Sequence, residues 1–145
     1  MHLTCREWLA LTRRPSTFYE EAAKKSKDYA LQYNGHYSND VRPWAECADG
    51  FRISIQAGWG LYCTPYGVNL EDGNYKTVEL GYPSEEEPLI FDYAEGNGEC
   101  GYTSTVYAQV PVEIVDKVLE KHGGIVNVQR VNRYLRGLER GGENA

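Results

Sequence analysis

The sequence predicts an α+β protein in which an antiparallel meander of four to five strands packs against helices. In the middle of the chain, from about residue 51, polar and apolar residues alternate with the period of a half-buried strand. On both sides of this region, capping residues precede segments with helical spacing of apolar residues. We therefore expect a helical N-terminal extension over residues 1–45, an α+β core domain over 46–125, and a C-terminal helix and tail over 126–145.

Two helices are expected in the N-terminal extension. Thr4 and Glu7 have the spacing of a capping box and precede the apolar segment WLAL. Thr17 and Glu20 repeat this spacing ahead of FYEEAAKKSKDYALQY, which is rich in helix formers and should be helical to about Gln32. The segment NGHYSNDVRP combines turn-forming residues with a proline, so it is expected to connect the extension to the core.

The core begins with the clearest strand of the chain. Phe51, Ile53 and Ile55 alternate with polar residues, and the glycines of AGWG can supply the positive φ angles of a short hairpin. The partner strand is therefore expected at residues 61–64. The segments YKTVELGY, LIFDYA and YTSTVYAQV are the remaining expected strands, because loops rich in glycine, asparagine, proline or acidic residues separate them.

The C-terminal part predicts two more helices. Pro111 suits a first helical position, and Lys121 and His122 suit the last turn, where basic side chains meet the negative end of the helix dipole. Gly123 should end this helix. Asn127 can cap the final helix, whose arginines face away from its apolar side.

The net charge of −6 is concentrated in the core domain. Residues 51–110 contain two basic and nine acidic residues, a net charge of −7. Such a surface repels nucleic acid and attracts basic partners. No apolar run approaches the roughly 18 residues that a membrane span requires, and no apolar signal-peptide core is present, so a soluble cytoplasmic protein is expected.

No enzymatic site is predicted. The four cysteines, which lack C-x-x-C spacing, are expected to be free and mostly buried, although one or two disulfides stay open: Cys5, Cys47, Cys63 and Cys100. Cys63 or Cys100 could pair with His36 or His122 as nucleophile and base, but buried thiols and a helix-end histidine explain these residues more simply.

Metal and phosphate sites are also not predicted, and no cofactor is expected. EDG at residues 71–73 lacks the alternating carboxylates of a calcium loop, and SEEEP is typical of a solvated turn. GNGECG lacks both a following helix and the lysine of a phosphate-binding loop.

The aromatic residues are the better indication of function. Twelve tyrosines and three tryptophans occur beside three phenylalanines, and aromatic rings with a polar group are enriched in binding hot spots. The alternative is that Trp59 folds back over the sheet edge. The residues predicted to bind a partner are Trp59, Tyr62, Tyr66, Tyr75, Glu71, Asp72, Glu85, Glu86 and Glu87.

A second candidate surface lies on the final helix. Arg130, Arg133 and Arg136 could hold the phosphates of a nucleotide stacked on aromatic rings, with the chain acting as a small-molecule sponge in a homo-oligomer. Arginines on a terminal helix are more often a solvated face.

Three segments of the core resemble small accessory proteins of tailed phages and prophages, over about residues 49–125. They are DGFRISIQAGWGLYCTP, VELGYPSEEEPLIFDYAE and TVYAQVPVEIVDKVLEKHGGI. Proteins of this kind often carry arginine where this chain has Tyr66, so the resemblance does not assign a ligand contact to Tyr66. The resemblance implies no catalytic residue. It implies a protein of the bacterial host cytoplasm that inhibits host machinery or a defence system, such as an anti-CRISPR factor.

The predicted function is therefore a non-enzymatic, phage-encoded binding protein. Its expected partner is a host protein with a basic surface, such as one that binds nucleic acid. The alternative is sequestration of a signalling nucleotide. Direct binding to nucleic acid or to a membrane is not expected.

Overall fold

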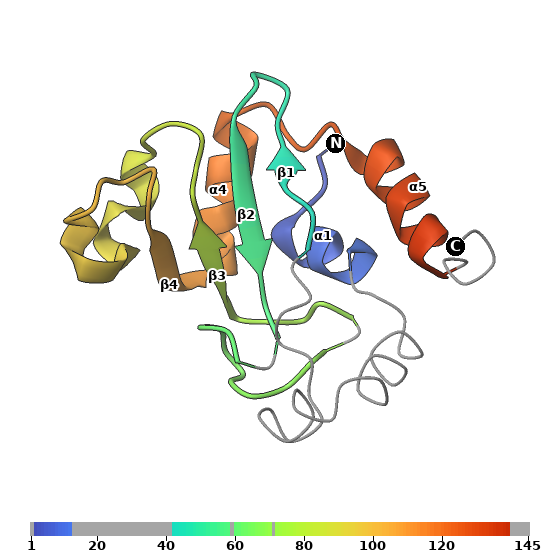
Figure 1. The fold of residues 1–145 in the computed structure, drawn as a ribbon, viewed down its shortest axis with the longest axis horizontal. Coiled ribbons are helices and arrows are strands. Elements are labelled where there is room, and N and C mark those ends of the chain that lie inside the picture. The colour runs from blue at the N-terminus through green and yellow to red at the C-terminus, as the bar shows by residue number, and fades with distance from the viewer. Residues whose placement is uncertain (1, 13–41, 59, 71, 140–145) are drawn as a thin grey trace.

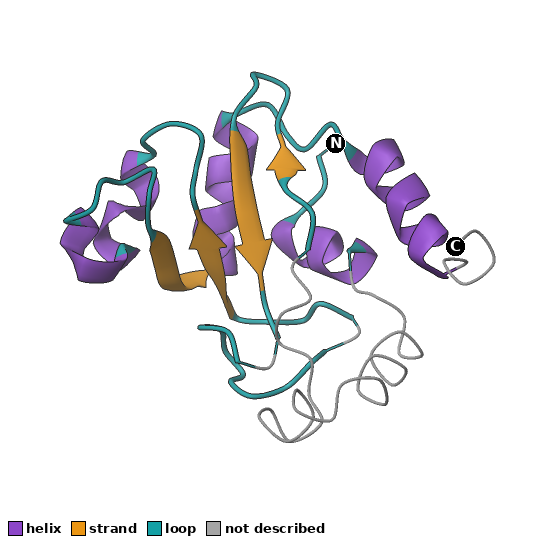
Figure 2. Ribbon diagram, in the orientation of Figure 1, coloured by secondary structure: helices purple, strands orange, loops and turns teal. Residues whose placement is uncertain are grey.

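The computed structural model describes residues 2–12, 42–58, 60–70 and 72–139, the last six by their backbone alone. The elements are α1 (Cys5–Leu11), β1 (Ala45–Glu46), β2 (Arg52–Gln56), β3 (Thr77–Gly81), the 3-10 helices η1 (Pro88–Tyr93) and η2 (Glu95–Gly98), β4 (Val106–Pro111), α4 (Val112–Lys121) and α5 (Val128–Glu139). Figure 2 shows that strands and helices are intermixed, and the predicted α+β class is confirmed.

The four strands form one antiparallel sheet in the order β1-β2-β3-β4, so each strand pairs with the next along the chain. Ile55 lies opposite Leu80, and Leu80 lies opposite Tyr107. The register between β3 and β4 shifts after Val78, and Gln109 has a φ of 50° near this irregularity. A β-bulge of this kind turns the following residues without ending the sheet.

Helices α1 and α4 cover one face of the sheet. Ile53, Ile55, Val78 and Leu80 share a single buried cluster with residues of three helices: Trp8 and Leu9 of α1, Val115, Val118 and Leu119 of α4, and Val131 of α5. In Figure 1, α4 lies behind β2 and β3. Burying a large apolar side chain contributes about 1.5–3 kcal/mol, so this layer fixes the position of the sheet.

Two of the predicted helix ends are confirmed. The Thr4 side chain accepts from the Glu7 N–H at 3.2 Å, and the Glu7 carboxylate accepts from the Thr4 N–H at 2.9 Å, which completes the capping box. His122 is the C-terminal cap of α4, and Gly123 follows with a φ of 89°. The helix expected at about residues 17–32 lies outside the described residues.

Asn127 directly precedes α5, and its side chain bonds to the backbone at and before β1. Its amide accepts from the Glu46 N–H at 3.1 Å and donates to the Trp44 carbonyl at 2.8 Å. The Val126 N–H donates to the Glu46 carbonyl at 2.8 Å, and Cys47 forms a bridge with Ile125. The segment before α5 therefore runs beside β1.

The prediction that residues 61–64 form a strand paired with β2 is wrong. Residues 61–64 form turns in which the Leu61 N–H donates to the Gly58 carbonyl, and only Thr64 makes an isolated bridge, to Thr77. The partners of β2 are β1 and β3. Gly58 and Gly60 both have positive φ angles, so the backbone turns here instead of extending as a strand.

The expected strand LIFDYA is also wrong, because this segment is η1. Pro88 occupies the first turn, and the Glu87 side chain accepts from the Leu89 N–H, so the start of a helix is capped. Two boundaries also differ from expectation. Strand β4 begins only at Val106, and Pro111 ends β4 as the residue before α4 rather than as its first residue.

Candidate functional site

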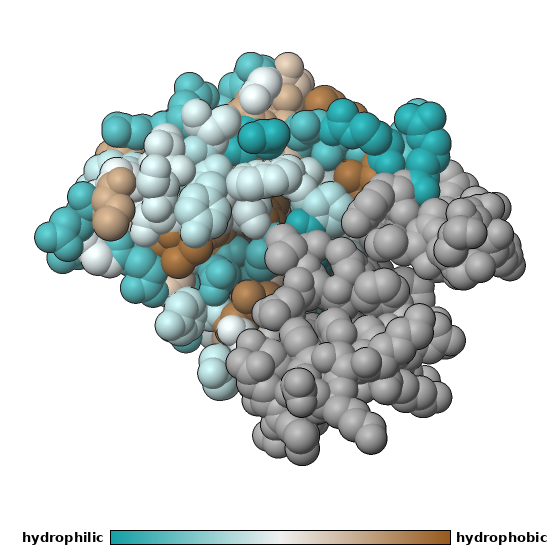
Figure 3. All heavy atoms as spheres, in the orientation of Figure 1, coloured by the Kyte–Doolittle hydropathy of each residue, from teal (hydrophilic) through white to brown (hydrophobic). Residues whose placement is uncertain are grey.

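None of the described helices covers the second face of the sheet, which we call the open face. It comprises the residues that alternate with those of the core cluster, of which Gln56 and Gly81 are themselves buried: Arg52, Ser54, Gln56, Thr77, Glu79, Gly81 and Val106. A Cβ atom built on Gly81 would lie 3.5 Å from Val106 and 3.8 Å from Ser54, which places these three small residues side by side. Figure 3 shows this side of the molecule, where much of the surface over the sheet has intermediate hydropathy.

Aromatic residues border the open face. The guanidinium of Arg52 lies 4.9 Å from the centre of the Trp44 ring, a cation–π contact. The Tyr62 N–H donates to the Glu79 carboxylate at 3.1 Å, which holds the backbone of Tyr62 over this face. Tyr82 follows β3, and the side chains of both tyrosines are 50% exposed. Burial raises the pKa of Glu79 above its ordinary value, against the opposing effect of the Tyr62 hydrogen bond.

The structure divides the predicted partner-binding residues between the two ends of the sheet. Tyr62, Tyr66 and Asp72 are exposed in the long connection from β2 to β3. Glu85 and Glu86 are exposed beyond the end of β3, next to the beginning of β2. Strand β2 has five residues and so spans roughly 15 Å.

Two predicted contact residues are buried, which corrects their assignment to the surface. Tyr75 is 0% exposed and its hydroxyl donates to the Val68 carbonyl at 3.1 Å. Glu87 is also 0% exposed. Trp59 and Glu71 lie outside the described residues.

Of the three arginines considered as phosphate contacts, Arg130 and Arg133 have described side chains. Arg130 forms an ion pair with Glu46, which already neutralises its charge locally. Arg133 is exposed on α5, and the Arg136 side chain lies outside the part of the chain that the structure describes.

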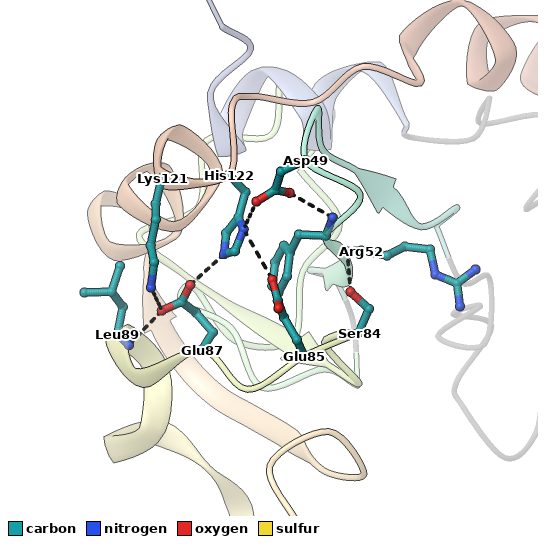
Figure 4. A network of polar contacts seen from close by, with 9 residues as sticks. Asp49, Arg52, Ser84, Glu85, Glu87, Leu89, Lys121 and His122 are labelled. Carbon is teal, nitrogen blue, oxygen red and sulfur yellow. Dashed lines mark hydrogen bonds and ion pairs between the residues drawn. The ribbon is translucent and has the colours of Figure 1, made fainter.

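A second feature is a network of charged side chains centred on Glu87, shown in Figure 4. One carboxylate oxygen of Glu87 accepts from Lys121 Nζ at 2.9 Å and from the Leu89 N–H at 3.1 Å. The other lies 2.7 Å from His122 Nε2. Burial raises the pKa of Glu87, but these hydrogen bonds outweigh it, so the pKa lies below its ordinary value.

The opposite edge of the imidazole faces two exposed carboxylates. His122 Nδ1 lies 2.6 Å from Asp49 Oδ2 and 3.8 Å from Glu85 Oε1. The Phe51 ring stacks on the imidazole with centroids 3.9 Å apart and planes inclined by 10°. Hydrogen bonds from the Phe51 N–H and from His122 lower the pKa of Asp49. The imidazole is therefore fixed by a stacked ring and by carboxylates on both sides.

Among the described residues, His122 does not form the cysteine–histidine pair considered from the sequence, and His36 lies outside those residues. Both nitrogens of His122 are taken by carboxylates, and the Cys63 thiol donates to the Gly58 carbonyl at 3.4 Å. Burial raises the pKa of the Cys63 thiol, which opposes formation of a nucleophilic thiolate. All four cysteines are free, as expected, but Cys100 is exposed.

Sequence reasoning missed the grouping of Asp49, Glu87 and His122. The available signals were a Lys-His pair at a helix end, an Asp-Gly turn and a run of three acidic residues. Each of these sequence features is explained by its own turn or helix end. Only the fold shows that residues 49, 87 and 122 are in contact.

Among the residues that the structure describes, no helix combines the length and the apolar character needed to cross a membrane. Comparison with protein-family models, with curated proteins and with solved structures found no match to this chain.

Proposed function

We propose that the protein acts by binding another protein through the open face of its sheet, without catalysing a reaction. The observation that carries this proposal is the composition of that face: Trp44, Arg52, Tyr62 and Tyr82 border a floor of small side chains. Tryptophan, tyrosine and arginine are the residues most enriched in binding hot spots.

The character of the floor supports the same proposal. Ser54, Gly81 and Val106 lie side by side as small residues between the larger rings, and hydrogen-bonded strands carry them. Rigid aromatic anchors lose little conformational entropy on binding. The Arg52–Trp44 pair is already assembled in the free protein, so a partner does not have to order it.

The charge of the chain favours a basic partner. The net charge is −6, and Asp72, Glu85 and Glu86 are exposed at the ends of the sheet that carries the open face. Acidic groups around an aromatic surface accelerate association with a basic protein and make it sensitive to salt. With the resemblance to phage accessory proteins, this leads us to propose a bacterial host protein, inhibited by occlusion of its basic surface.

A comparison of two surface variants tests the proposal. The first changes Tyr62→Ser and Tyr82→Ser on the open face, and the control changes Leu89→Ser and Val126→Ser, which are exposed at 42% and 61% elsewhere. Tagged proteins are used to capture partners from host cells, with cross-linking and mass spectrometry to locate the contacts. We expect a captured protein, cross-linked beside the open face, to be retained by the control and lost by the face variant.

Salt provides the second part of this test. Capture should weaken at about 0.5 M NaCl and on charge reversal at Asp72 and Glu86, because both remove long-range attraction. Equal capture by wild type and the face variant would refute the open face as the binding surface. Capture that is insensitive to both salt and charge reversal would refute the basic partner.

A further inference from the structure

We propose that Asp49, Glu85 and His122 form a binding site for a divalent metal ion of the zinc class. One ligand atom from each residue, namely His122 Nδ1 and a carboxylate oxygen from each acid, lies within 4.8 Å of the other two. Imidazole nitrogen and carboxylate oxygen are both ordinary zinc ligands, and three protein ligands leave a fourth position for water or another group. This proposal is independent of the protein-binding function of the open face.

The buried Glu87 prepares His122 for this role. Histidines that bind metals usually donate their other ring N–H to a carboxylate, which fixes the tautomer and the ring orientation. Glu87 Oε1 lies 2.7 Å from His122 Nε2 and the carboxylate is 0% exposed, so Nε2 carries a proton and Nδ1 faces the two exposed acids. Glu87 is thus a positioning residue outside the set of three ligands.

The site combines one rigid ligand with two adjustable ones. The imidazole is held by Glu87 and by the stacked Phe51 ring. The Asp49 and Glu85 side chains are 47% and 62% exposed, and they now lie 2.6 Å and 3.8 Å from Nδ1. Ligand atoms bound about 2.0–2.2 Å from zinc lie about 3.3 Å apart in a tetrahedral site, so the two exposed carboxylates have to adjust around the fixed imidazole.

The charges also match a divalent cation. Asp49, Glu85 and Glu87 contribute three negative charges, and Lys121, bonded to Glu87, contributes one positive charge, so the group keeps a net negative charge even when both ring nitrogens of His122 carry a proton. The remaining nearby cation, Arg52, points away from the carboxylates in Figure 4 and lies against Trp44. A bound metal would replace the proton between Nδ1 and Asp49 and balance this charge.

Zinc titration of the full-length protein with its purification tag removed tests the site. Binding is measured by calorimetry, and the ring nitrogens of His122 are observed by ¹⁵N NMR. We expect one equivalent of zinc to shift the Nδ1 resonance strongly while Nε2 keeps the signal of an N–H group. A titration that leaves both nitrogens of His122 unchanged, or that shows zinc bound at Nε2, would overturn the proposal.

Substitutions identify the other ligands. Asp49→Asn keeps the oxygen that accepts from the Phe51 N–H, and Glu85→Gln changes an exposed side chain, so both variants should fold. Each should weaken zinc binding by about tenfold or more, while the neighbouring Glu86→Gln, which removes the same charge outside the site, should not. Equal affinities for all three variants would refute the assignment of ligands.

The positioning role of Glu87 has its own signature. In Glu87→Gln the amide oxygen can still accept from Lys121, but the amide NH₂ then faces His122 Nε2, which must accept. The single remaining ring proton is then held on Nδ1, the atom proposed to bind zinc. We expect zinc affinity to fall about 10–100-fold, with loss of the N–H signal of Nε2 in the metal-free variant. An unchanged tautomer with unchanged affinity would refute this role.

Discussion

The energetic importance of the buried Glu87 can be measured by replacing it with alanine and with glutamine. Its carboxylate accepts hydrogen bonds from Lys121, His122 and the Leu89 N–H at 2.7–3.1 Å. Removing one member of a buried ion pair costs about 3–5 kcal/mol, mainly because the remaining partners lose their bonds. The Lys121 side chain is 49% exposed and can return to water, so the lower end of this range, about 3 kcal/mol, is expected for Glu87→Ala.

Glu87→Gln should cost less, about 1–2 kcal/mol. The amide has nearly the shape of the carboxylate, and it can keep all three contacts if the His122 tautomer changes, so the loss is limited to the charge assistance of the hydrogen bonds. The control is Glu86→Ala, a neighbouring exposed residue for which a change within about 0.5 kcal/mol is expected.

Urea unfolding followed by circular dichroism gives the three free energies of unfolding. A metal chelator should be present, so that the result reports the protein network alone. The reasoning would be refuted if Glu87→Ala were as stable as Glu86→Ala, or if the glutamine variant were less stable than the alanine variant.

Three further predictions concern other parts of the molecule. Gly73→Ala should lower the free energy of unfolding in urea by at least about 1 kcal/mol more than Gly67→Ala. Both glycines have a positive φ, but only a Cβ on Gly73 would meet backbone atoms of α1, at 2.5 and 2.7 Å. Equal losses of stability would contradict the close packing. Burial raises the pKa of Tyr107 from 10.0 to about 12, so the unfolded chain loses this proton first and stability should fall by about 2–3 kcal/mol as pH rises from about 10 to 12. Tyr107→Phe should lack this component when both proteins are unfolded at several alkaline pH values, and parallel curves would contradict it. Iodoacetamide should modify Cys100 alone in the native protein and all four cysteines after unfolding, as mass spectrometry of the peptides can show; rapid native labelling of a buried cysteine would contradict the fold.

Local chemistry explains which parts of the fold could be predicted from the sequence. The capping box of Thr4 and Glu7 needs only residues three positions apart, and the glycine after His122 adopts the positive φ angle that commonly ends a helix. The alternation in β2 predicted its buried face correctly, because Ile53 and Ile55 are 0% exposed. Such signals depend on neighbours along the chain.

The errors arose where two local signals compete or where distant residues decide the structure. The apolar segment LIFDYA has the length of a strand, but the bond from the Leu89 N–H to Glu87 favours a 3-10 turn. Glu87 is one of three consecutive acids, and only the approach of Lys121 and His122 from α4 distinguishes the buried one. Composition likewise could not separate the buried Tyr75 from the exposed Tyr62.

The segment at residues 125–127 has a consequence for how the molecule can associate. It bonds to the backbone of β1 through Val126 and Asn127. At the far side of the sheet, Ala94 bridges to Tyr107 of β4. A neighbouring segment therefore lies along β1 and another meets β4 at one position, which hinders edge-to-edge stacking of copies and extension of the sheet by a peptide at these points. A partner would then contact side chains on the open face of the sheet, and the identity of those side chains can distinguish one partner from another.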